Sequence, residues 1–287
     1  MITRTKHYLI PILLILFCIS DIETIISGMK KALNVCASSI VPSLFLFMIL
    51  SEITVSLLLK NNSVSHPKII IFFLGALCGF PIGAAVCEKL YTNGIIDKKS
   101  AKALMPFCNI ASPAFVIGAI GVSMLKSKEL GIVIYTSQVL SSLMPILFIK
   151  CKGAKKEYSP QNNKATEIIF DSIDSSTSKM LKLCALICFF ATLLATIENT
   201  FLVYLSPILE ISCGSSFCAN LYNTNPYLSI LLCGFCCGFS GICVHFQVIM
   251  TAKTININYK EFFIIKFFQG VFSGILSVVL YYFFFYA

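Results

Sequence analysis

The residues best suited to bind a polar solute lie in apolar stretches that glycine and proline interrupt. In the first such stretch, Asn109 and Ser112 stand within one helical turn of each other, directly before Pro113. A carboxamide and a hydroxyl carry donors and acceptors that fit many polar solutes. The same groups can instead cap the ends of a broken helix. The sequence leaves both interpretations open.

A second set of polar residues lies near the end of the chain. His245 and Gln247 follow a cluster of glycines, and Gln269 lies in the next apolar stretch. A neutral imidazole and an amide beside a broken helix could bind solute or relay protons. A structural hydrogen bond between helices explains them almost as well. The solute site that we predict is lined by Asn109, Ser112, His245, Gln247 and Gln269.

Two carboxylates, Glu52 and Glu198, lie inside long apolar segments. A buried carboxylate costs several kcal/mol unless it is paired or protonated, so ionisable groups inside a membrane are candidates for function. The alternative is that each side chain lies near the membrane surface and extends to water. Only about seven residues separate Glu52 from Lys60, which favours this alternative for Glu52.

No pattern typical of an enzyme is present in the sequence. The chain has no GxxxxGK[ST] phosphate loop and no HExxH zinc pattern. Gly79 and Gly83 have the spacing of a GxSxG nucleophile elbow, but Pro81 stands where the serine would be. Most of the 14 cysteines lie in apolar segments, where a free thiol behaves as a small hydrophobe. We predict a protein that is not an enzyme and that holds no metal and no cofactor.

Composition indicates where these residues are placed. Hydrophobic residues make up 57% of the chain and charged residues 12%, and the mean hydropathy is +0.87. A soluble domain has about twice that charged fraction, and the apolar runs reach the roughly 20 helical residues that cross a bilayer. The formal charge of +9 comes from basic residues in short loops, which is typical of cytoplasmic loops and not of a nucleic-acid surface. We predict an all-α bundle of transmembrane helices that contacts the lipid bilayer and has no nucleic-acid partner.

Two neighbouring apolar segments, 69–87 and 103–125, are expected to be broken helices joined by a hydrophilic connection over 88–102. Proline inside a helix removes a backbone donor and clashes with the preceding turn. In a membrane such a break is tolerated only where protein or a water-filled cavity satisfies the freed backbone groups. Glycine also lets helices pack closely without any ligand. The residues predicted to form helix breaks or a gate are Gly79, Pro81, Gly83, Pro113, Gly118, Gly238 and Gly241.

The chain is expected to hold about eight spans, and seven to nine fit the pattern. Residues 1–31 are predicted to form an N-terminal span or signal anchor, and 32–150 the first membrane half. Within 32–59, Pro42 leaves open one tilted helix or two half-helices.

A hydrophilic stretch, 151–182, divides the chain. It has the composition of a flexible linker, and its excess of lysine places it in the cytoplasm. Residues 183–287 then form the second membrane half. The loop over 210–225 has no Lys or Arg and is expected outside, whereas the basic connection over 253–266 is expected inside.

The two halves share an internal repeat. Leu77-Cys78-Gly79-Phe80 recurs as Leu232-Cys233-Gly234-Phe235, and the glycines of 238–241 resemble those of 79–83. Each motif precedes a basic connection and then a segment with a carboxamide, Asn109 or Gln269. Secondary transporters commonly carry such repeats, with the binding site between discontinuous helices.

The motif around the first break is long enough to compare with known families. It consists of Gly79-Phe80-Pro81-x-Gly83-Ala84, Leu90-Tyr91-x-x-Gly94-x-Ile96, Ala101, Phe107-Cys108-Asn109 and Ser112-Pro113-x-Phe115-x-Ile117-Gly118-Ala119-x-Gly121, with weaker matches at 41–45 and 241–247. This string resembles the sporulation integral membrane protein family called YlbJ. Two departures are a shorter chain and Leu46 where a second proline is usual.

The resemblance implies a Gate domain, also named for nucleoside recognition and shared with nucleoside and ferrous-iron transporters. It further implies an endospore-forming bacterium, a cell-membrane location and a role in forming the spore, in particular its cortex. It does not identify a substrate. We predict a protein that moves or gates a small polar solute. The alternative is a structural or assembly protein whose breaks serve packing against other membrane proteins or a second copy of the chain.

Overall fold

The structure is a computed structural model that describes residues 21–61, 63–153, 164–197 and 201–286. All regular structure in these residues is helical, so the predicted all-α class is confirmed. The described residues include four helical segments long and apolar enough to cross a membrane, which are Lys128–Phe148, Ala165–Thr196, Pro226–Thr251 and Tyr259–Tyr286. Large apolar side chains are exposed on the outer faces of the helices, as expected where helices face lipid; examples are Leu46, Phe73, Phe148, Phe170 and Phe268.

The first half opens with one long helical run. Helix α2 (Ile22–Val35) continues through the π-helical turn η1 (Cys36–Ile40) into α3 (Val41–Lys60). Pro42 lies in the first turn of α3, where a helix tolerates the missing N–H, and the wider π turn precedes it. This segment is therefore a single run and not two half-helices. The division expected between residues 31 and 32 falls inside α2.

The next two segments are both interrupted. Helices α4 (Pro67–Cys78) and α5 (Ile82–Thr92) are separated at 79–81, where Gly79 has a φ of 85° that favours glycine. Helix α6 (Lys98–Cys108) and the π-helix η2 (Ala114–Met124) are separated over 109–113.

The hydrophilic connection over 88–102 is shorter than expected. Because α5 extends to Thr92 and α6 begins at Lys98, only 93–97 lies between the two helices. The Asp97 side chain accepts a hydrogen bond from the Ser100 backbone N–H at 2.8 Å and so caps α6. Polar residues here extend the helices instead of forming a loop.

Helix α7 (Lys128–Phe148) ends the first half, and α8 (Ala165–Ile197) begins the second. The predicted flexible linker over 151–182 is therefore helical from Ala165 onward. The polar residues of this stretch occupy the first half of a 33-residue helix that buries Ser172 and Ser176. The polar composition of this stretch is typical of a solvated linker. Composition does not show that one face of a polar helix is covered by another helix, and for this reason the prediction was wrong from Ala165 onward.

The rest of the chain begins with short helices. The turn η3 (Phe201–Leu205) leads into α9 (Ser206–Leu209) and α10 (Ile211–Ala219), so part of the loop expected over 210–225 is helical. Helices α11 (Pro226–Phe239) and α12 (Gly241–Thr251) are separated at Ser240, which has a φ of 73°. After the turn η4 (Lys253–Ile255), α13 (Tyr259–Tyr286) closes the chain.

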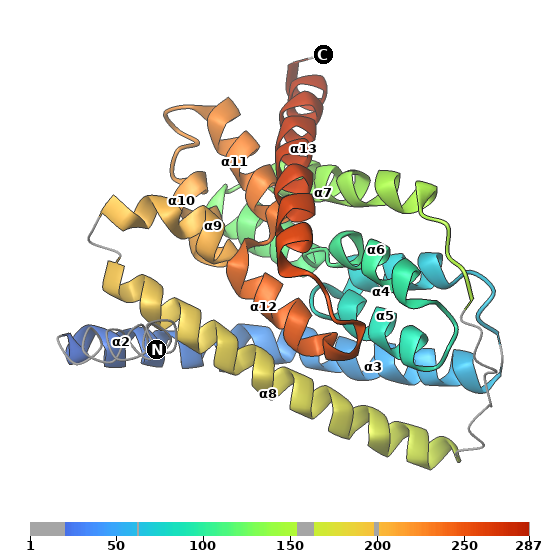
Figure 1. The fold of residues 1–287 in the computed structure, drawn as a ribbon. Helices are drawn as coiled ribbons and strands as arrows, with labels where there is room; N and C mark the ends of the chain where they lie inside the picture. The colour runs from blue at the N-terminus through green and yellow to red at the C-terminus, as the bar shows by residue number, and fades with distance from the viewer. Residues whose placement is uncertain (1–20, 62, 154–163, 198–200, 287) are drawn as a thin grey trace, which may run out of the picture.

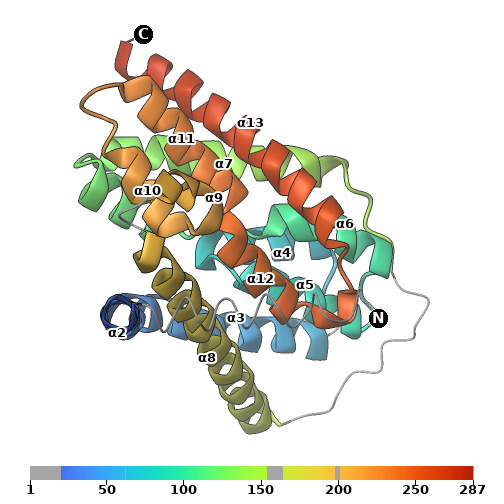
Figure 2. The same ribbon diagram turned by 60° about the vertical axis from the view of Figure 1, so that its left-hand side comes forward.

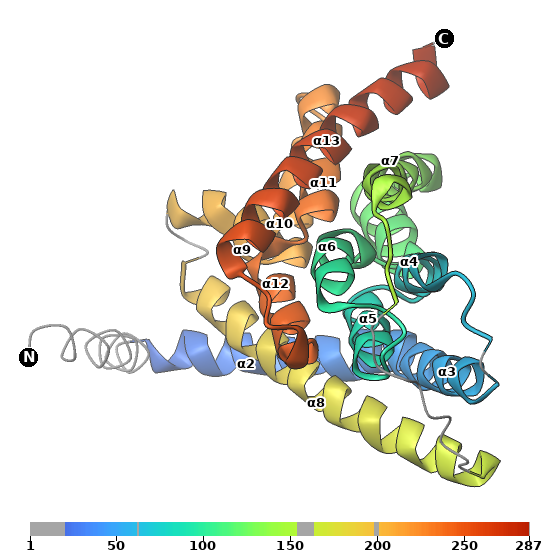
Figure 3. The ribbon, with the colours of Figure 1, turned by 45° about the vertical axis from the view of Figure 1, so that its right-hand side comes forward.

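The helices form two packed groups. Helix α11 lies along α13 and both contact α7, whereas α8 crosses the long α2–α3 run (Figures 1 and 2). The half-helices α5 and α12 contact each other between these groups (Figure 3). Helix α5 also packs on α3, and α12 packs on α8. Each half thus places the second part of its broken helix against its own long helix.

Candidate functional site

The two breaks of the first half pack directly on each other. A Cβ atom at Gly79 would lie 2.8 Å from the Cβ of Ser112, so glycine is required at this contact. Gly75 and Gly83, on either side of the first break, both leave room for the backbone carbonyl of Cys108 at the end of α6. The interrupted α4–α5 pair therefore encloses the broken end of α6.

Asn109 holds this arrangement together. Its side-chain Oδ1 accepts a hydrogen bond from the Ala84 backbone N–H at 3.2 Å, and its Nδ2 donates to the Met105 carbonyl at 2.7 Å. Ala84 lies in the first turn of α5, where backbone N–H groups have no partner within the helix. The Ser112 hydroxyl accepts from the Phe115 N–H at 3.3 Å and caps η2. Both polar groups thus satisfy broken helix ends, which is one of the two roles that the sequence left open.

A buried lysine links this break to the second half. The Lys266 ammonium donates to the Asn109 carbonyl at 3.4 Å and to Gln269 Oε1 at 3.0 Å, and Lys266 is 1% exposed. The Gln269 amide in turn donates to the Ser142 hydroxyl on α7 at 2.7 Å. The two carboxamides predicted from the repeat, Asn109 and Gln269, are therefore joined through Lys266.

A cavity of about 300 Å³ lies between α5, α8 and α12. Pro81, at the first break, and Gln247, on α12 after the second break, both line it. Gln247 is buried; its Nε2 donates to the Cys243 sulfur at 3.4 Å, and its Oε1 has no hydrogen-bond partner among the described residues. Lysines dominate the charged lining, which comprises Glu88, Lys179, Lys182 and Lys253.

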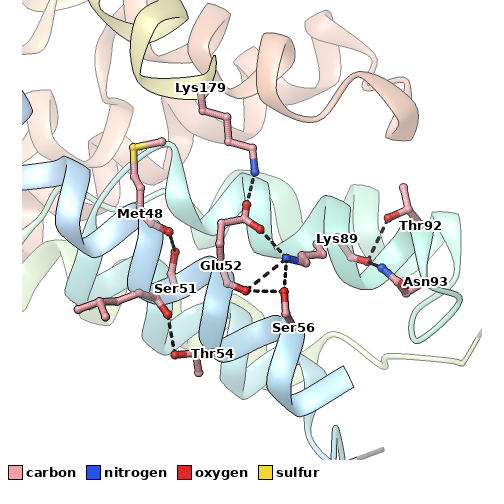
Figure 4. A network of polar contacts seen from close by, with 10 residues as sticks. Met48, Ser51, Glu52, Thr54, Ser56, Lys89, Thr92, Asn93 and Lys179 are labelled. Atoms are coloured by element: carbon pink, nitrogen blue, oxygen red, sulfur yellow. Dashed lines mark hydrogen bonds and ion pairs between the residues drawn. The ribbon is translucent and has the colours of Figure 1, made fainter. Parts of the chain in front are cut away.

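An adjoining cavity of about 470 Å³ lies between α3, α5 and α8 and shares Glu88, Ser175 and Lys179 with the first. At its edge the Glu52 carboxylate lies between two ammonium groups (Figure 4). Lys89 on α5 approaches at 2.5 Å, and Lys179 on α8 forms the second ion pair.

Glu52 is buried between its two partners. The residue is 6% exposed, and its carboxylate forms ion pairs with Lys89 and Lys179. Lys89 also donates to the Ser56 hydroxyl at 2.7 Å, which fixes the ammonium against α3. Glu52 thereby connects the long helix of the first half to that of the second.

His245 lies outside both cavities. Its Nε2 is 2.9 Å from the Phe239 carbonyl at the end of α11, and its ring is in edge contact with the rings of Phe239 and Phe262 at centroid distances of 4.7 and 5.1 Å. The ring caps the first part of the broken helix inside an aromatic cluster. Its Nδ1 is buried and has no hydrogen-bond partner in the part of the chain that the structure describes.

The other predicted residues have varied surroundings. Pro113 stands at the start of η2, Gly118 has open space where a Cβ would lie, and Gly241 contacts the backbone of Glu210. Gly238 packs against Ser273 and Gly270 of α13, which allows the close approach of the two helices. Glu198 lies outside the described residues.

The sequence repeat corresponds only in part to a structural one. Gly79 ends α4, but Gly234, its counterpart in the shared Leu-Cys-Gly-Phe motif, lies inside α11 against Ser277. The second break occurs instead at Ser240, within the glycine cluster. Asn109 lies at a break, whereas Gln269 belongs to the uninterrupted α13.

Sequence reasoning missed the basic residues of the site. Lys266 was assigned to the basic connection over 253–266, yet it lies on α13, which begins at Tyr259. The available signal was a single charge followed by 21 uncharged residues, since an ionisable group in an apolar span is a candidate for function. Lys179 was assigned to the linker. No group of three or more His, Cys, Asp or Glu side chains among the described residues could hold a metal ion.

Comparison with known proteins gives one significant match. The sporulation integral membrane protein YlbJ of Bacillus subtilis (strain 168) is 23% identical to this chain over an alignment 322 positions long. The alignment covers 91% of this chain and 79% of that protein. No family model matches the chain, and no solved structure matches it. The Gate domain therefore stays a prediction. The chain is a distant relative of a membrane protein of sporulation, which agrees with its apolar helices and with the motif around the first break.

Proposed function

We propose that this chain is a multi-pass protein of the cell membrane in an endospore-forming bacterium, where it acts in spore formation by moving or gating a small polar solute. The name of its distant relative supports the sporulation role. The observation that carries the solute role is the 300 Å³ cavity, which brings together Pro81 and Gln247 from the broken helices of the two halves. Transporters commonly place their binding sites between such discontinuous helices.

The gating step is placed at the half-helices of the two halves. Helices α5 and α12 contain 11 residues each and begin directly after a break, and a tilt of α5 would have to release the Lys89–Glu52 ion pair with α3. Asn109 joins α5 to α6, and Lys266 joins α6 to α13. In the open conformation α5 is tilted. A solute that binds this conformation more tightly than the closed one shifts the protein toward it, and the difference between the two affinities sets the size of the shift.

Substitutions at the two breaks of the first half test this role. In sporulating cells, Asn109→Ala and Pro81→Ala should abolish heat-resistant spores while the protein remains in the membrane at its usual level. Asn34→Ala and Pro67→Ala are matched controls, because Asn34 is exposed on α2 and Pro67 occupies the first turn of α4, where a proline is not needed for a break. Full spore yield from both break variants would rule out this site.

A ligand screen is the complementary experiment. Purified protein should be heated with nucleosides, amino acids or metal ions, because a ligand that binds the folded state stabilises it by about 2.7 kcal/mol at 100 times its dissociation constant. A positive compound should then cross vesicles that contain the protein and not vesicles that lack it.

The rival function is assembly with other membrane proteins. It is favoured by the end of α13, where Tyr282, Phe283, Phe284 and Tyr286 are exposed. Aromatic side chains are enriched at protein interfaces, but they are equally frequent at membrane surfaces. Co-purification of a stoichiometric partner, without solute flux in vesicles, would support assembly over transport.

A further inference from the structure

A third cavity begins where the 300 Å³ cavity ends along α8. Leu186 lines the 300 Å³ cavity, and the next residue, Ile187, lines the third one. The third cavity has a volume of about 450 Å³ and lies between α2, α8, α9 and α10. Helices α9 and α10 lie above the crossing of α2 and α8 in Figures 1 and 3. Glu210 lines this cavity, and its backbone contacts Gly241, directly after the break at Ser240. The cavity therefore borders the break of the second half.

The two walls of the third cavity differ in polarity. Helix α10 contributes the polar residues Ser212 and Ser216, followed by its C-cap residue Asn220. These residues recur every fourth position, so they lie on one face of the helix. Cys213 and Phe217 of the same helix also line the cavity. The opposite wall, from α2 and α8, is apolar and includes Ala32, Val35, Ile187, Ala191, Leu194 and Ala195. A ligand that fills the cavity therefore has a polar side and an apolar side.

Glu210 adds a negative charge to the polar wall. The residue is 7% exposed and forms no ion pair among the described residues. Glu52, the other buried carboxylate in the described part of the chain, has two ammonium partners. Lysines dominate the charged lining of the 300 Å³ cavity, whereas the third cavity has Lys31, which is exposed on α2. A buried charge without a counter-charge is costly, and a cation in this cavity would supply one.

Capping of α10 does not explain why residue 210 is charged. Glu210 Oε2 accepts a hydrogen bond from the Cys213 N–H at 2.8 Å and so caps the helix. Serine, threonine and asparagine are preferred at this position and carry no charge. Ser206 lines the same cavity one turn earlier, and its carbonyl accepts from the Glu210 N–H at 3.0 Å. The Ser206 hydroxyl is buried and has no hydrogen-bond partner among the described residues. A carboxylate and a hydroxyl thus lie close together at the cavity.

We propose that the third cavity binds an organic cation, whose ammonium group pairs with Glu210 and whose apolar part lies against α2 and α8. A primary ammonium has three donors, which suit a carboxylate and neighbouring hydroxyls. An inorganic cation would leave most of the 450 Å³ and the apolar wall without contact. The site goes beyond the proposed function, because it shares no lining residue with the 300 Å³ cavity. The ammonium belongs either to a soluble amine or to the head group of an aminophospholipid.

Thermal unfolding of the full-length protein in a nonionic detergent tests this site. The probes are phenethylamine, a cation with an apolar ring at neutral pH, and 2-phenylethanol, which has the same ring and no charge. A ligand that binds the folded state raises Tm with its concentration. We expect this response to phenethylamine in the wild type and in Glu261→Gln, the control, because Glu261 is exposed and lines none of the three cavities. We expect a much smaller response to 2-phenylethanol.

Two variants locate the probe. The amide of Glu210→Gln can still accept the Cys213 N–H, so Tm without probe should stay near that of the wild type. Its affinity for phenethylamine should fall at least about tenfold, because the charge partner is lost. Ser216→Leu keeps the charge but fills the cavity from an exposed position on α10, and it should also weaken binding.

Nanodiscs distinguish the two sources of the ammonium group. They consist of phosphatidylglycerol with or without phosphatidylethanolamine. A higher Tm with phosphatidylethanolamine, present in the wild type and lost in Glu210→Gln, assigns the ammonium to a lipid. The phenethylamine response without this lipid effect assigns it to a soluble amine.

Three results would overturn the inference. If phenethylamine leaves the wild-type Tm unchanged, or 2-phenylethanol raises it as much, the cavity holds no cation site. If sodium chloride at the same concentration has the effect of phenethylamine, the apolar wall takes no part. If Glu210→Gln folds and keeps the full response, Glu210 is not the charged contact. Where Glu210→Gln does not fold, Ser216→Leu decides, because an unchanged response in this variant shows that phenethylamine binds outside the cavity.

Discussion

The Lys266 Nζ atom lies 3.4 Å from the backbone carbonyl oxygen of Asn109, so the last helix of the second half caps the broken end of α6 in the first half. An ammonium group at a helix C-terminus is favourable because the last carbonyls carry partial negative charge. Among the described residues Lys266 forms no ion pair, and its two partners are neutral oxygens. Opening of the break over 109–113 must therefore change the surroundings of this lysine.

Loss of the ammonium should loosen the break locally. In Lys266→Met the Asn109 carbonyl loses its donor, and we expect faster amide hydrogen exchange in a peptide that spans 109–116. The measurement is hydrogen exchange by mass spectrometry on the purified protein. Lys260→Met is the control, since Lys260 is exposed near the start of the same helix. Equal exchange in wild type and Lys266→Met would show that the contact does not hold the break.

The close packing at the first break predicts a contrast between two glycines. A Cβ at Gly83 would overlap the Cys108 carbonyl, and backbone cannot yield as a flexible side chain does. We expect Gly83→Ala to destabilise the protein by about 3 kcal/mol, the upper range for overpacked sites. A Cβ at Gly118 meets no atom within 4 Å, so Gly118→Ala should not destabilise the protein and should stabilise it by up to about 1 kcal/mol. Thermal unfolding of both variants makes the comparison, and equal Tm values would contradict the packing described.

Removal of the Glu52 charge should weaken the connection between the two long helices. Glu52→Gln leaves Lys89 and Lys179 without their carboxylate partner. A fully buried pair loses about 3–5 kcal/mol when one partner is removed, and an exposed pair about 1 kcal/mol or less. The lysine side chains are 25% and 20% exposed, so we expect a loss of about 2 kcal/mol.

A double-mutant cycle with Lys179→Met measures this coupling directly. Lys182→Met is the control, because Lys182 is exposed on the same helix and forms neither of the two ion pairs of Glu52. If Glu52→Gln is as stable as the Lys182→Met control, the carboxylate does not connect the halves.

The cap of α6 predicts a pH dependence outside the membrane spans. Hydrogen bonding from Ser100, through its hydroxyl and its backbone N–H, holds the pKa of the Asp97 carboxyl below its usual range. A carboxyl with a lowered folded-state pKa stabilises the protein above its unfolded-state pKa of about 3.9, and this contribution disappears as the pH falls through the folded-state value.

Asp97→Asn should therefore retain most of the cap and lose its pH dependence, whereas Asp97→Ala should lose about 1 kcal/mol at neutral pH. Thermal unfolding between pH 3 and 7 tests both variants. If the Tm of the wild type and the Tm of Asp97→Asn fall equally with pH below about pH 4, Asp97 is not the source of the pH dependence.

The apolar helices and their interruptions could be predicted from the sequence, because they depend on the backbone preferences of the residues themselves. Long apolar runs with few charges require helices in a bilayer. Pro81 and Gly79 interrupt one of these helices, because proline lacks a donor and glycine alone readily adopts a φ of 85°. The break between α6 and η2, which lies before Pro113, follows from the same local rule. These features require no knowledge of what packs against them.

The tertiary structure decided which polar groups meet, and this the sequence could not supply. Lys266 and Lys179 looked like loop residues because a boundary between a loop and a helix shifts with the packing of the helix ends. Gln138 and Gln269 look alike as amides in apolar runs, yet the Gln269 side chain bonds to Ser142 and Lys266, whereas that of Gln138 has no hydrogen-bond partner among the described residues. Whether a buried donor is satisfied depends on atoms from helices distant in the chain. The sequence by itself determined the apolar helices and the breaks at 79–81 and before Pro113, and packing between helices determined where the polar helices begin and which polar groups meet.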